Sequence, residues 1–227
     1  MEKATLEKAP SKVLVIDIGG TNVKILATGE EFRRKFPSGK GLTPEQMVQG
    51  VKDLAADWIY DAVAIGYPGP VMNNRPVIEP GNLGPGWVDF DFETAFGHPV
   101  KMLNDAALQA YGSYEGGKML FLGLGTGLGS CMIVEDLILP LELAHLPFRK
   151  STFEDYVGVR GLEMLGKKVW TEVVHEVVGL LRAALLPDIT VIGGGNVKKL
   201  KILPEGCKAG SNSNAFVGGF RLWQNDH

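Results

Sequence analysis

Short apolar runs that stop at glycine or polar residues recur along the chain and predict β-strands. They cover residues 13–17, 23–27, 32–36, 62–65, 100–103, 119–124, 130–134 and 189–192. Apolar residues at helical spacing replace this pattern at 47–58, 106–111, 169–184 and 216–223. The first helix has the clearest start, because Thr43-Pro44-Glu45-Gln46 combines a cap residue, a proline and a glutamine three residues after the cap. Hairpins followed by alternating helices and strands predict a mixed α/β fold.

One strand-and-turn pattern occurs twice. Residues 12–21 and residues 118–127, 106 positions further on, are both apolar strands that enter a Gly/Thr turn and leave as another strand. The identity between them is low, so a chance similarity and a structural repeat both stay open. A repeat predicts two lobes that each open with the same hairpin. We expect an N-terminal lobe at 1–104, a C-terminal lobe at 105–212, and a helix at 213–227 that completes the first lobe.

Composition narrows the function classes. Thirty of the 227 residues are glycine, against a usual share of roughly 7%, so the backbone turns sharply or approaches a ligand closely at many places. The net charge of −3 without a basic block argues against nucleic-acid binding. No apolar run is long enough to span a membrane, and the first residues do not resemble a secretory signal. The two cysteines, Cys131 and Cys207, are typical of reduced thiols in a cytoplasmic protein.

The glycine-rich turns are candidate anion sites. Turns of Gly, Gly and Thr expose successive backbone N–H groups and a hydroxyl, which suits a phosphate chain. The other interpretation is that they are ordinary hairpin turns. Asp17 stands just before the first turn, where a carboxylate oxygen suits Mg²⁺.

Two further pairs combine polar residues with a predicted structural transition. Asn104 and Asp105 lie where a strand meets a helix, so they predict either a helix cap or a general base that takes a proton from a substrate hydroxyl. Glu142 and His145 interrupt an apolar stretch. They are consistent with a satisfied core pair, a metal pair or a pair that hydrogen-bonds the hydroxyl groups of a ligand.

Taken in order, these features resemble the sugar kinases of the ROK family, within the actin-like ATPase/hexokinase superfamily. The resemblance rests on five segments: Asp17-Ile-Gly-Gly-Thr-Asn-Val-Lys24, Ile65-Gly-Tyr-Pro-Gly-Pro-Val71, Leu103-Asn-Asp-Ala106, Leu124-Gly-Thr-Gly-Leu-Gly-Ser130 and Ile192-Gly-Gly-Gly-Asn196. It implies an α/β fold of two ribonuclease H-like lobes around a central cleft. Within the family, Asn82-Leu-Gly-Pro-Gly-Trp87 and the short length look most like the polyphosphate glucokinases.

The resemblance implies transfer of a phosphoryl group from polyphosphate, ATP or both to the 6-hydroxyl of glucose, a cytoplasmic reaction of carbohydrate metabolism. Asp105 is then the base, and Asn82, Asn104, Asp105, Glu142 and His145 contact the sugar. Mg²⁺ is held near Asp17. The implied phosphate- and nucleotide-binding residues are Asp17, Gly19, Gly20, Thr21, Lys24, Gly125, Thr126, Gly127, Gly193, Gly194, Gly195 and Asn196. A homodimer is expected, because members of the family are commonly dimers.

The sequence also departs from the family pattern. Ala144 replaces the glycine of the E-x-G-H segment. The cysteine-rich zinc motif of many ATP-dependent members is missing, and with it the second sugar-contacting glutamate. Two alternatives therefore stay open: an ATP-dependent kinase for another hexose, and a sugar-binding regulator of weak activity. A DNA-binding repressor is not expected, because about 11 residues precede the first strand and leave no room for a helix-turn-helix.

Overall fold

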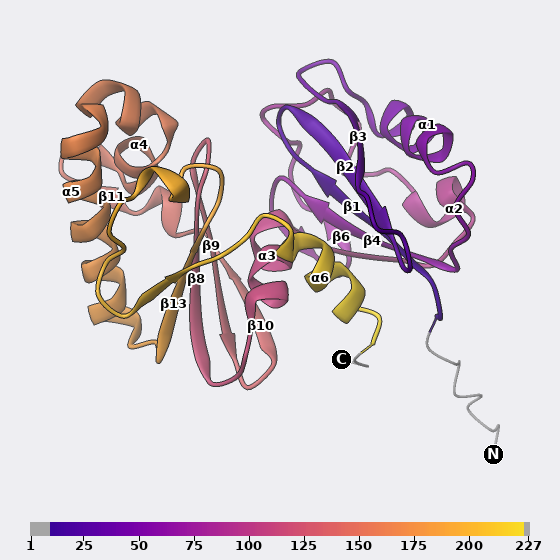
Figure 1. The fold of residues 1–227 in the computed structure, drawn as a ribbon. Coiled ribbons are helices and arrows are strands. Elements are labelled where there is room, and N and C mark those ends of the chain that lie inside the picture. Colours follow the sequence, from indigo (N-terminus) through magenta and orange to yellow (C-terminus); the bar gives the residue numbers. More distant parts are fainter. Residues whose placement is uncertain (1–9, 225–227) are drawn as a thin grey trace. The chain divides into compact units, whose positions relative to one another are not determined.

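The computed structural model describes residues 10–224, and within them the chain forms two compact units (Figure 1). Unit 1 consists of the described residues up to Leu103 together with those from Gly219 onward. Unit 2 runs from Asn104 to Gly218. The ends of the expected lobe ranges, 1–9 and 225–227, lie outside the described residues. No helix between residues 10 and 224 is long and apolar enough to cross a membrane.

Unit 1 is built on a five-stranded sheet in the order β3-β2-β1-β4-β7. Strands β1, β2 and β3 are antiparallel neighbours, whereas β4 pairs parallel to β1. The elements are β1 Val13–Ile18, β2 Asn22–Ala27, β3 Arg34–Pro37, α1 Pro44–Leu54, β4 Ala62–Tyr67, β5 Val71–Met72, β6 Arg75–Pro76, α2 Phe92–Phe96 and β7 Val100–Asn104.

Strand β1 is buried along its whole length because both faces of the sheet are covered. On one face, Ile16 and Ile18 belong to the same core as Met47 and Val51 of α1. Helix α1 starts at the expected place, with reciprocal hydrogen bonds between Thr43 and Gln46. On the other face, Gly219 packs directly on Val15, and a β-carbon there would overlap the valine side chain. Trp223 adds a hydrogen bond from its indole Nε1 to the carbonyl oxygen of Val63.

Unit 2 repeats this strand arrangement, with the order β10-β9-β8-β13-β14. Strands β8, β9 and β10 are antiparallel neighbours, and β13 pairs parallel to β8. The structural repeat is thereby confirmed. The elements are α3 Asp105–Ser113, β8 Lys118–Leu124, β9 Leu128–Val134, β10 Leu137–Leu141, β11 Pro147–Phe148, β12 Ser151–Thr152, α4 Phe153–Val157, α5 Val159–Leu185, β13 Ile189–Gly193, β14 Cys207–Ala209 and α6 Asn214–Arg221, with 3₁₀ turns at Leu143–His145 and Val197–Lys199.

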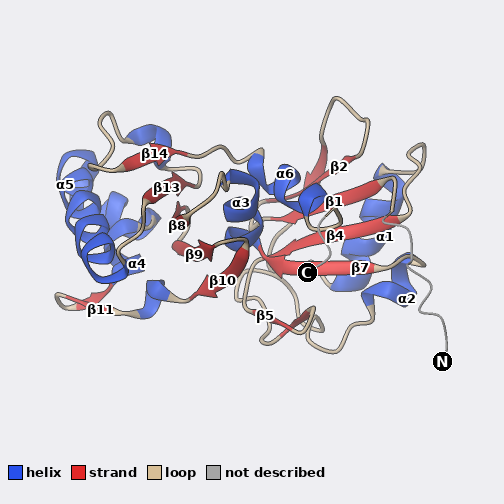
Figure 2. Ribbon diagram, turned by 90° about the horizontal axis from the view of Figure 1, so that it is seen from below, coloured by secondary structure: helices blue, strands red, loops and turns tan. Residues whose placement is uncertain are grey.

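Helices cover both faces of the second sheet (Figures 1 and 2). Trp170 and Val174 of α5 are buried in one core with Leu122 of β8. On the other face α3 lies against β9, where Gly129 leaves space for the Ala106 methyl group. Helix α6 crosses α3 closely at Gly112 and Gly218, since a β-carbon at either glycine would overlap backbone of the other helix. The α/β fold with two five-stranded sheets agrees with the expected fold class.

Candidate functional site

The first glycine turn joins β1 to β2 and comprises residues 19–22. Ser38, just after β3, occupies two of its carbonyl oxygens: the hydroxyl donates to Gly19 at 2.5 Å and the amide donates to Thr21 at 3.0 Å. Within residues 10–224, the amide N–H groups of Gly20 and Thr21 have no protein partner. The turn therefore holds its acceptors in internal bonds and leaves two donors for an anion.

Asp17 and Lys24 lie beside this turn as neighbours on β1 and β2. Lys24 Nζ donates to Asp17 Oδ2 at 2.7 Å, and Asp17 is 5% exposed. The carboxylate is thus buried and charge-compensated, which is the state in which a buried acid is tolerated. No group of three His, Cys, Asp or Glu side chains within residues 10–224 is arranged to hold a metal ion.

The loop of residues 79–87 brings Asn82 against the first turn. Asn82 Nδ2 lies 2.6 Å from the point where a β-carbon on Gly20 would stand. Leu83 and Trp87, which both follow Asn82, are buried in the unit 1 core, so this part of the loop is anchored while Asn82 stays partly exposed. The structure thus places an amide side chain next to the free donors of the first turn.

The second glycine turn, residues 125–127, joins β8 to β9 in unit 2 and shows the same hydrogen-bonding arrangement as the first. Its carbonyl oxygens are again occupied: Val159 donates to Thr126 at 3.1 Å, and Asn196 Nδ2 donates to Gly125 at 3.0 Å. The amides of Thr126 and Gly127 have no partner among residues 10–224. Both turns consequently present unpaired N–H groups, as the phosphate interpretation expects.

The third glycine turn, Gly193 to Gly195, packs against the second one. Gly194 has φ of 81°, and a β-carbon there would overlap the carbonyl of Leu124, so only glycine fits. Asn196 is 8% exposed and donates its backbone N–H to Leu124 at 2.9 Å. In this structure Asn196 fastens the two turns together; a contact with a nucleotide stays a prediction.

Asn104 and Asp105 stand at the junction of β7 and α3. Asn104 Oδ1 accepts from the amides of Ala106 and Ala107 at 2.9 and 3.2 Å, so the predicted helix cap is confirmed for this residue. Asp105 is the first residue of α3 and is partly exposed, and its Oδ1 accepts from Ala106 N at 2.7 Å. Its carboxylate lies at the N-terminus of α3, where negative charge interacts favourably with the helix dipole.

Glu142 and His145 lie at a 3₁₀ turn after β10. Their side chains are 53% and 68% exposed, so the core-pair interpretation is wrong. His145 Nε2 is 3.8 Å from Glu142 Oε2, while His145 Nδ1 is 3.8 Å from Glu154 Oε1. Glu154, on α4, is a residue that sequence reasoning missed. Helix α4 thus supplies a carboxylate beside the pair from outside the Glu142–His145 segment.

Glu154 also touches the second turn, since a β-carbon on Gly127 would overlap its carboxylate. It thus connects the Glu142–His145 pair with the unpaired amides of residues 126–127. Burial raises the pKa of Glu142 above its usual value; the positive charge of His145 opposes this, and the charge of Glu154 adds to it. Ala144 is buried with a negative φ, so this chain does not need the glycine usual at that position.

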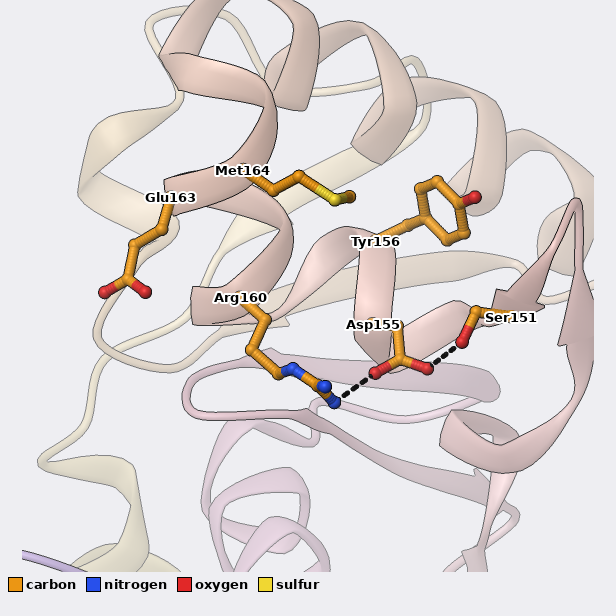
Figure 3. A pocket seen from close by; sticks show the side chains of 6 residues that line it. All are labelled: Ser151, Asp155, Tyr156, Arg160, Glu163 and Met164. Atoms are coloured by element: carbon orange, nitrogen blue, oxygen red, sulfur yellow. Dashed lines mark hydrogen bonds and ion pairs between the residues drawn. The ribbon is translucent and has the colours of Figure 1, made fainter.

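A hollow of about 510 Å³ lies between α4 and the start of α5, and its lining does not include Glu142, His145 or Glu154 (Figure 3). Asp155 lines this hollow and accepts hydrogen bonds from Arg160 Nη1 at 2.6 Å, Thr152 Oγ1 at 2.9 Å and Ser151 Oγ. These contacts lower the pKa of Asp155. Its charge is already satisfied within the protein, and we do not assign the hollow to the candidate site.

Each unit therefore gathers its own candidate groups. Unit 1 holds the phosphate turn with Asp17, Lys24 and Asn82, and unit 2 holds the other two glycine turns with Asn104, Asp105, Glu142, His145 and Glu154.

Comparisons with known proteins give the same picture. Residues 13–139 match the model of the ROK family. The chain is 27% identical over 206 residues to a polyphosphate glucokinase of Mycobacterium leprae, which covers 81% of this chain and 63% of that protein. The chain thus spans less than two thirds of that relative.

Two solved structures share the fold. An inorganic polyphosphate/ATP-glucomannokinase from Arthrobacter sp. strain KM superposes with a TM-score of 0.80 at 22% identity, over 97% of this chain and 100% of that one. A ROK family glucokinase from Streptomyces griseus, in complex with glucose and AMPPNP, has a TM-score of 0.73 at 18% identity, over 94% and 99%. These likenesses show the fold, and the match of residues 13–139, more than half of the chain, to the family model shows that the chain belongs to the ROK family.

Proposed function

We propose that this protein is a sugar kinase that transfers a phosphoryl group from polyphosphate, ATP or both to the 6-hydroxyl of glucose. The observation that carries the proposal is the pair of glycine turns whose acceptors are occupied and whose amides at residues 20, 21, 126 and 127 are unpaired. Donors of this kind suit the oxygens of a phosphate chain, and they need no rearrangement to bind it. The family and the names of the relatives support the choice of reaction.

Asp105 is the proposed base. Its carboxylate takes the proton of the sugar hydroxyl as the hydroxyl oxygen attacks the terminal phosphorus, and the bond from phosphorus to the donor's bridging oxygen breaks. The leaving phosphate keeps the electron pair of that bond. Asn104 contributes indirectly as well as through the sugar, because it caps the helix that carries Asp105.

The sugar is held by hydrogen bonds from exposed polar side chains. The proposed contacts of unit 2 are Glu142, Glu154, His145 and Asn104, and the proposed contact of unit 1 is Asn82. Carboxylates and amides at fixed spacing distinguish hexoses by the hydroxyls that they present, since a missing hydroxyl leaves a polar group unpaired.

The first turn and the second turn are each proposed to bind phosphate groups of the donor, with the third turn beside the second as a nucleotide contact. The fit to Mg²⁺ is that of a substrate-borne ion: Asp17 offers one carboxylate, and phosphate oxygens complete the ligands. Bound there, Mg²⁺ would offset the charge of the transferring group. Lys24 pairs with Asp17 at 2.7 Å in the absence of the donor.

A coupled assay for glucose 6-phosphate in the presence of Mg²⁺ tests the proposal, with ATP and polyphosphate as alternative donors. We expect turnover with at least one of them. Mannose and N-acetylmannosamine in place of glucose separate the glucokinase from a kinase of another hexose. Absence of turnover with every hexose and both donors would contradict a kinase and favour the sugar-binding regulator. Both cysteines are free thiols, which fits the proposed cytoplasmic location, and a homodimer stays a prediction.

A further inference from the structure

Glu79 is a surface carboxylate that no motif of the sequence includes, yet it closes the loop that carries Asn82. Its Oε2 accepts from the amide of Trp87 at 3.1 Å, and its Oε1 accepts from the amide of Val88 at 3.3 Å. One side chain thus joins the first residue of the loop to the two residues at its end. Hydrogen bonds to a charged acceptor are stronger than neutral ones.

Other contacts hold the loop at further points. Tyr67 donates its hydroxyl to the carbonyl of Ile78 at 2.9 Å, and Gly84 donates its amide to Leu42 at 2.9 Å. Trp87 is completely buried beside Tyr67, with ring centroids 5.8 Å apart. Between these fixed points the chain projects Asn82 toward Gly20.

We propose that Glu79 is a positioning residue for the sugar: by gripping Trp87 and Val88 it fixes the loop in the shape that holds Asn82 over the first turn. The inference rests on the proposed function, because it assigns Asn82 to the hexose. Glu79 itself touches no reacting atom. Loss of its grip lets Asn82 move away from its hydrogen-bonding position while the base and the donor turns keep theirs.

The substitution Glu79→Gln tests this, because it keeps the size of the side chain but replaces one acceptor oxygen by an NH₂ group that cannot accept from an amide. We expect the Kd and KM for glucose to rise about tenfold, the effect of losing roughly one charge-assisted hydrogen bond. We expect kcat and the KM for the donor to stay within about twofold. Glu31→Gln, an exposed carboxylate of the same unit, is the matched control and should change none of these constants.

The double variant Glu79→Gln/Asn82→Ala separates positioning from general stability. If Glu79 acts through Asn82, the double variant binds glucose no more weakly than Asn82→Ala alone. Additive losses would overturn the proposal, and so would an unchanged glucose Kd in Glu79→Gln. Should Glu79→Gln fail to fold, Glu79→Asp retains the charge with a shorter reach and is read in the same way.

Glucose binding is measured by isothermal titration calorimetry without a donor, so the two proposals fail separately. A protein that binds glucose but never phosphorylates a hexose refutes the kinase and leaves the role of Glu79 open to the same titration. A protein that neither binds nor phosphorylates a hexose refutes both.

Discussion

The two sheets have the same strand order, but the first hairpin of each carries different chemistry. In unit 1 the penultimate residue of β1 is Asp17, a buried acid paired with Lys24. In unit 2 the position 106 residues further on is Gly123, so that strand has no acid before its turn. Glu154 of α4 instead reaches the second turn from outside the hairpin. The repeated topology fixes where the turns lie, whereas the charged residues beside them come from the hairpin itself in unit 1 and from α4 in unit 2.

The largest effect is expected from removing the proposed base, which the comparison assigns to unit 2. Asp105→Asn should lower kcat by about 10²–10⁴-fold, because the sugar hydroxyl loses its proton acceptor. The glucose Kd should change little, since the amide still occupies the same place. Steady-state kinetics and calorimetry measure the two quantities. Glu172→Gln, an exposed carboxylate on α5, is the control; full activity in Asp105→Asn would refute the assignment of the base.

The two turns should respond differently to the same substitution. A methyl group at Gly20 meets the Asn82 amide at 2.6 Å, whereas a β-carbon at Gly125 meets nothing within 4 Å. We expect Gly20→Ala to raise the KM for glucose by about 10–100-fold through displacement of Asn82, an effect typical of small misplacements at a site. Gly125→Ala should affect only the donor KM. Equal effects on the glucose KM would show that the turns are not specialised.

The decrease in glucose affinity at low pH tests whether Glu154 acts on Glu142. Burial and the charge of Glu154 raise the pKa of Glu142, so protonation weakens its acceptor role at a higher pH than for an ordinary carboxyl. Glucose affinity should therefore fall as the pH drops through this raised pKa. Glu154→Gln removes one raising charge and should move the fall to lower pH. Calorimetric Kd values across pH measure it, and a midpoint that does not move, or that moves equally in Glu163→Gln, contradicts the coupling.

The smallest expected effect tests stability alone. Thr43→Ala removes the cap of α1 and should lower the free energy of unfolding by about 1 kcal/mol, the usual value for such a cap. Denaturant unfolding measures the loss. The Thr43 side chain bonds to Gln46 within α1, whereas the contact with the loop of Asn82 is made by the neighbouring Leu42, so kcat and both KM values should stay at the wild-type level. A change in the glucose KM would show that the start of α1 supports that loop.

Much of the fold followed from residues whose effects are local. The capping box at Thr43 and the apolar run before Gly19 predicted α1 and β1 because neighbouring residues determine them. Helix α2 was missed since its five residues are too few for helical spacing to stand out. Strand β10 does not stand out as a strand in the sequence, because it contains Pro140 and its exposed residues Leu137 and Leu139 are apolar, so the usual alternation of apolar and polar positions is missing.

The site was predictable where a motif was contiguous and not where it was assembled. The glycine turns, Asn104 and Asp105 stand in short segments that sequence alone brings together. Glu154 lies nine residues beyond His145, and only the intervening β11–β12 hairpin returns it to the imidazole. Glu79 is a single acid in a loop, and its contacts are with the backbone amides of Trp87 and Val88. Backbone amides are common to nearly all residues, so the sequence pattern does not indicate such contacts.

The return of the chain to unit 1 has a consequence for synthesis on the ribosome. Val63 and Trp223, which share a hydrogen bond, are 160 residues apart. At about 5–20 residues per second, roughly 10–30 s separate their emergence. Unit 2 is one continuous segment, so it can complete its fold first. The face of β1 that carries Val15 is covered only when Gly219 and Trp223 have been synthesised. Until then Val15 is exposed on the nascent chain, where chaperones can bind it.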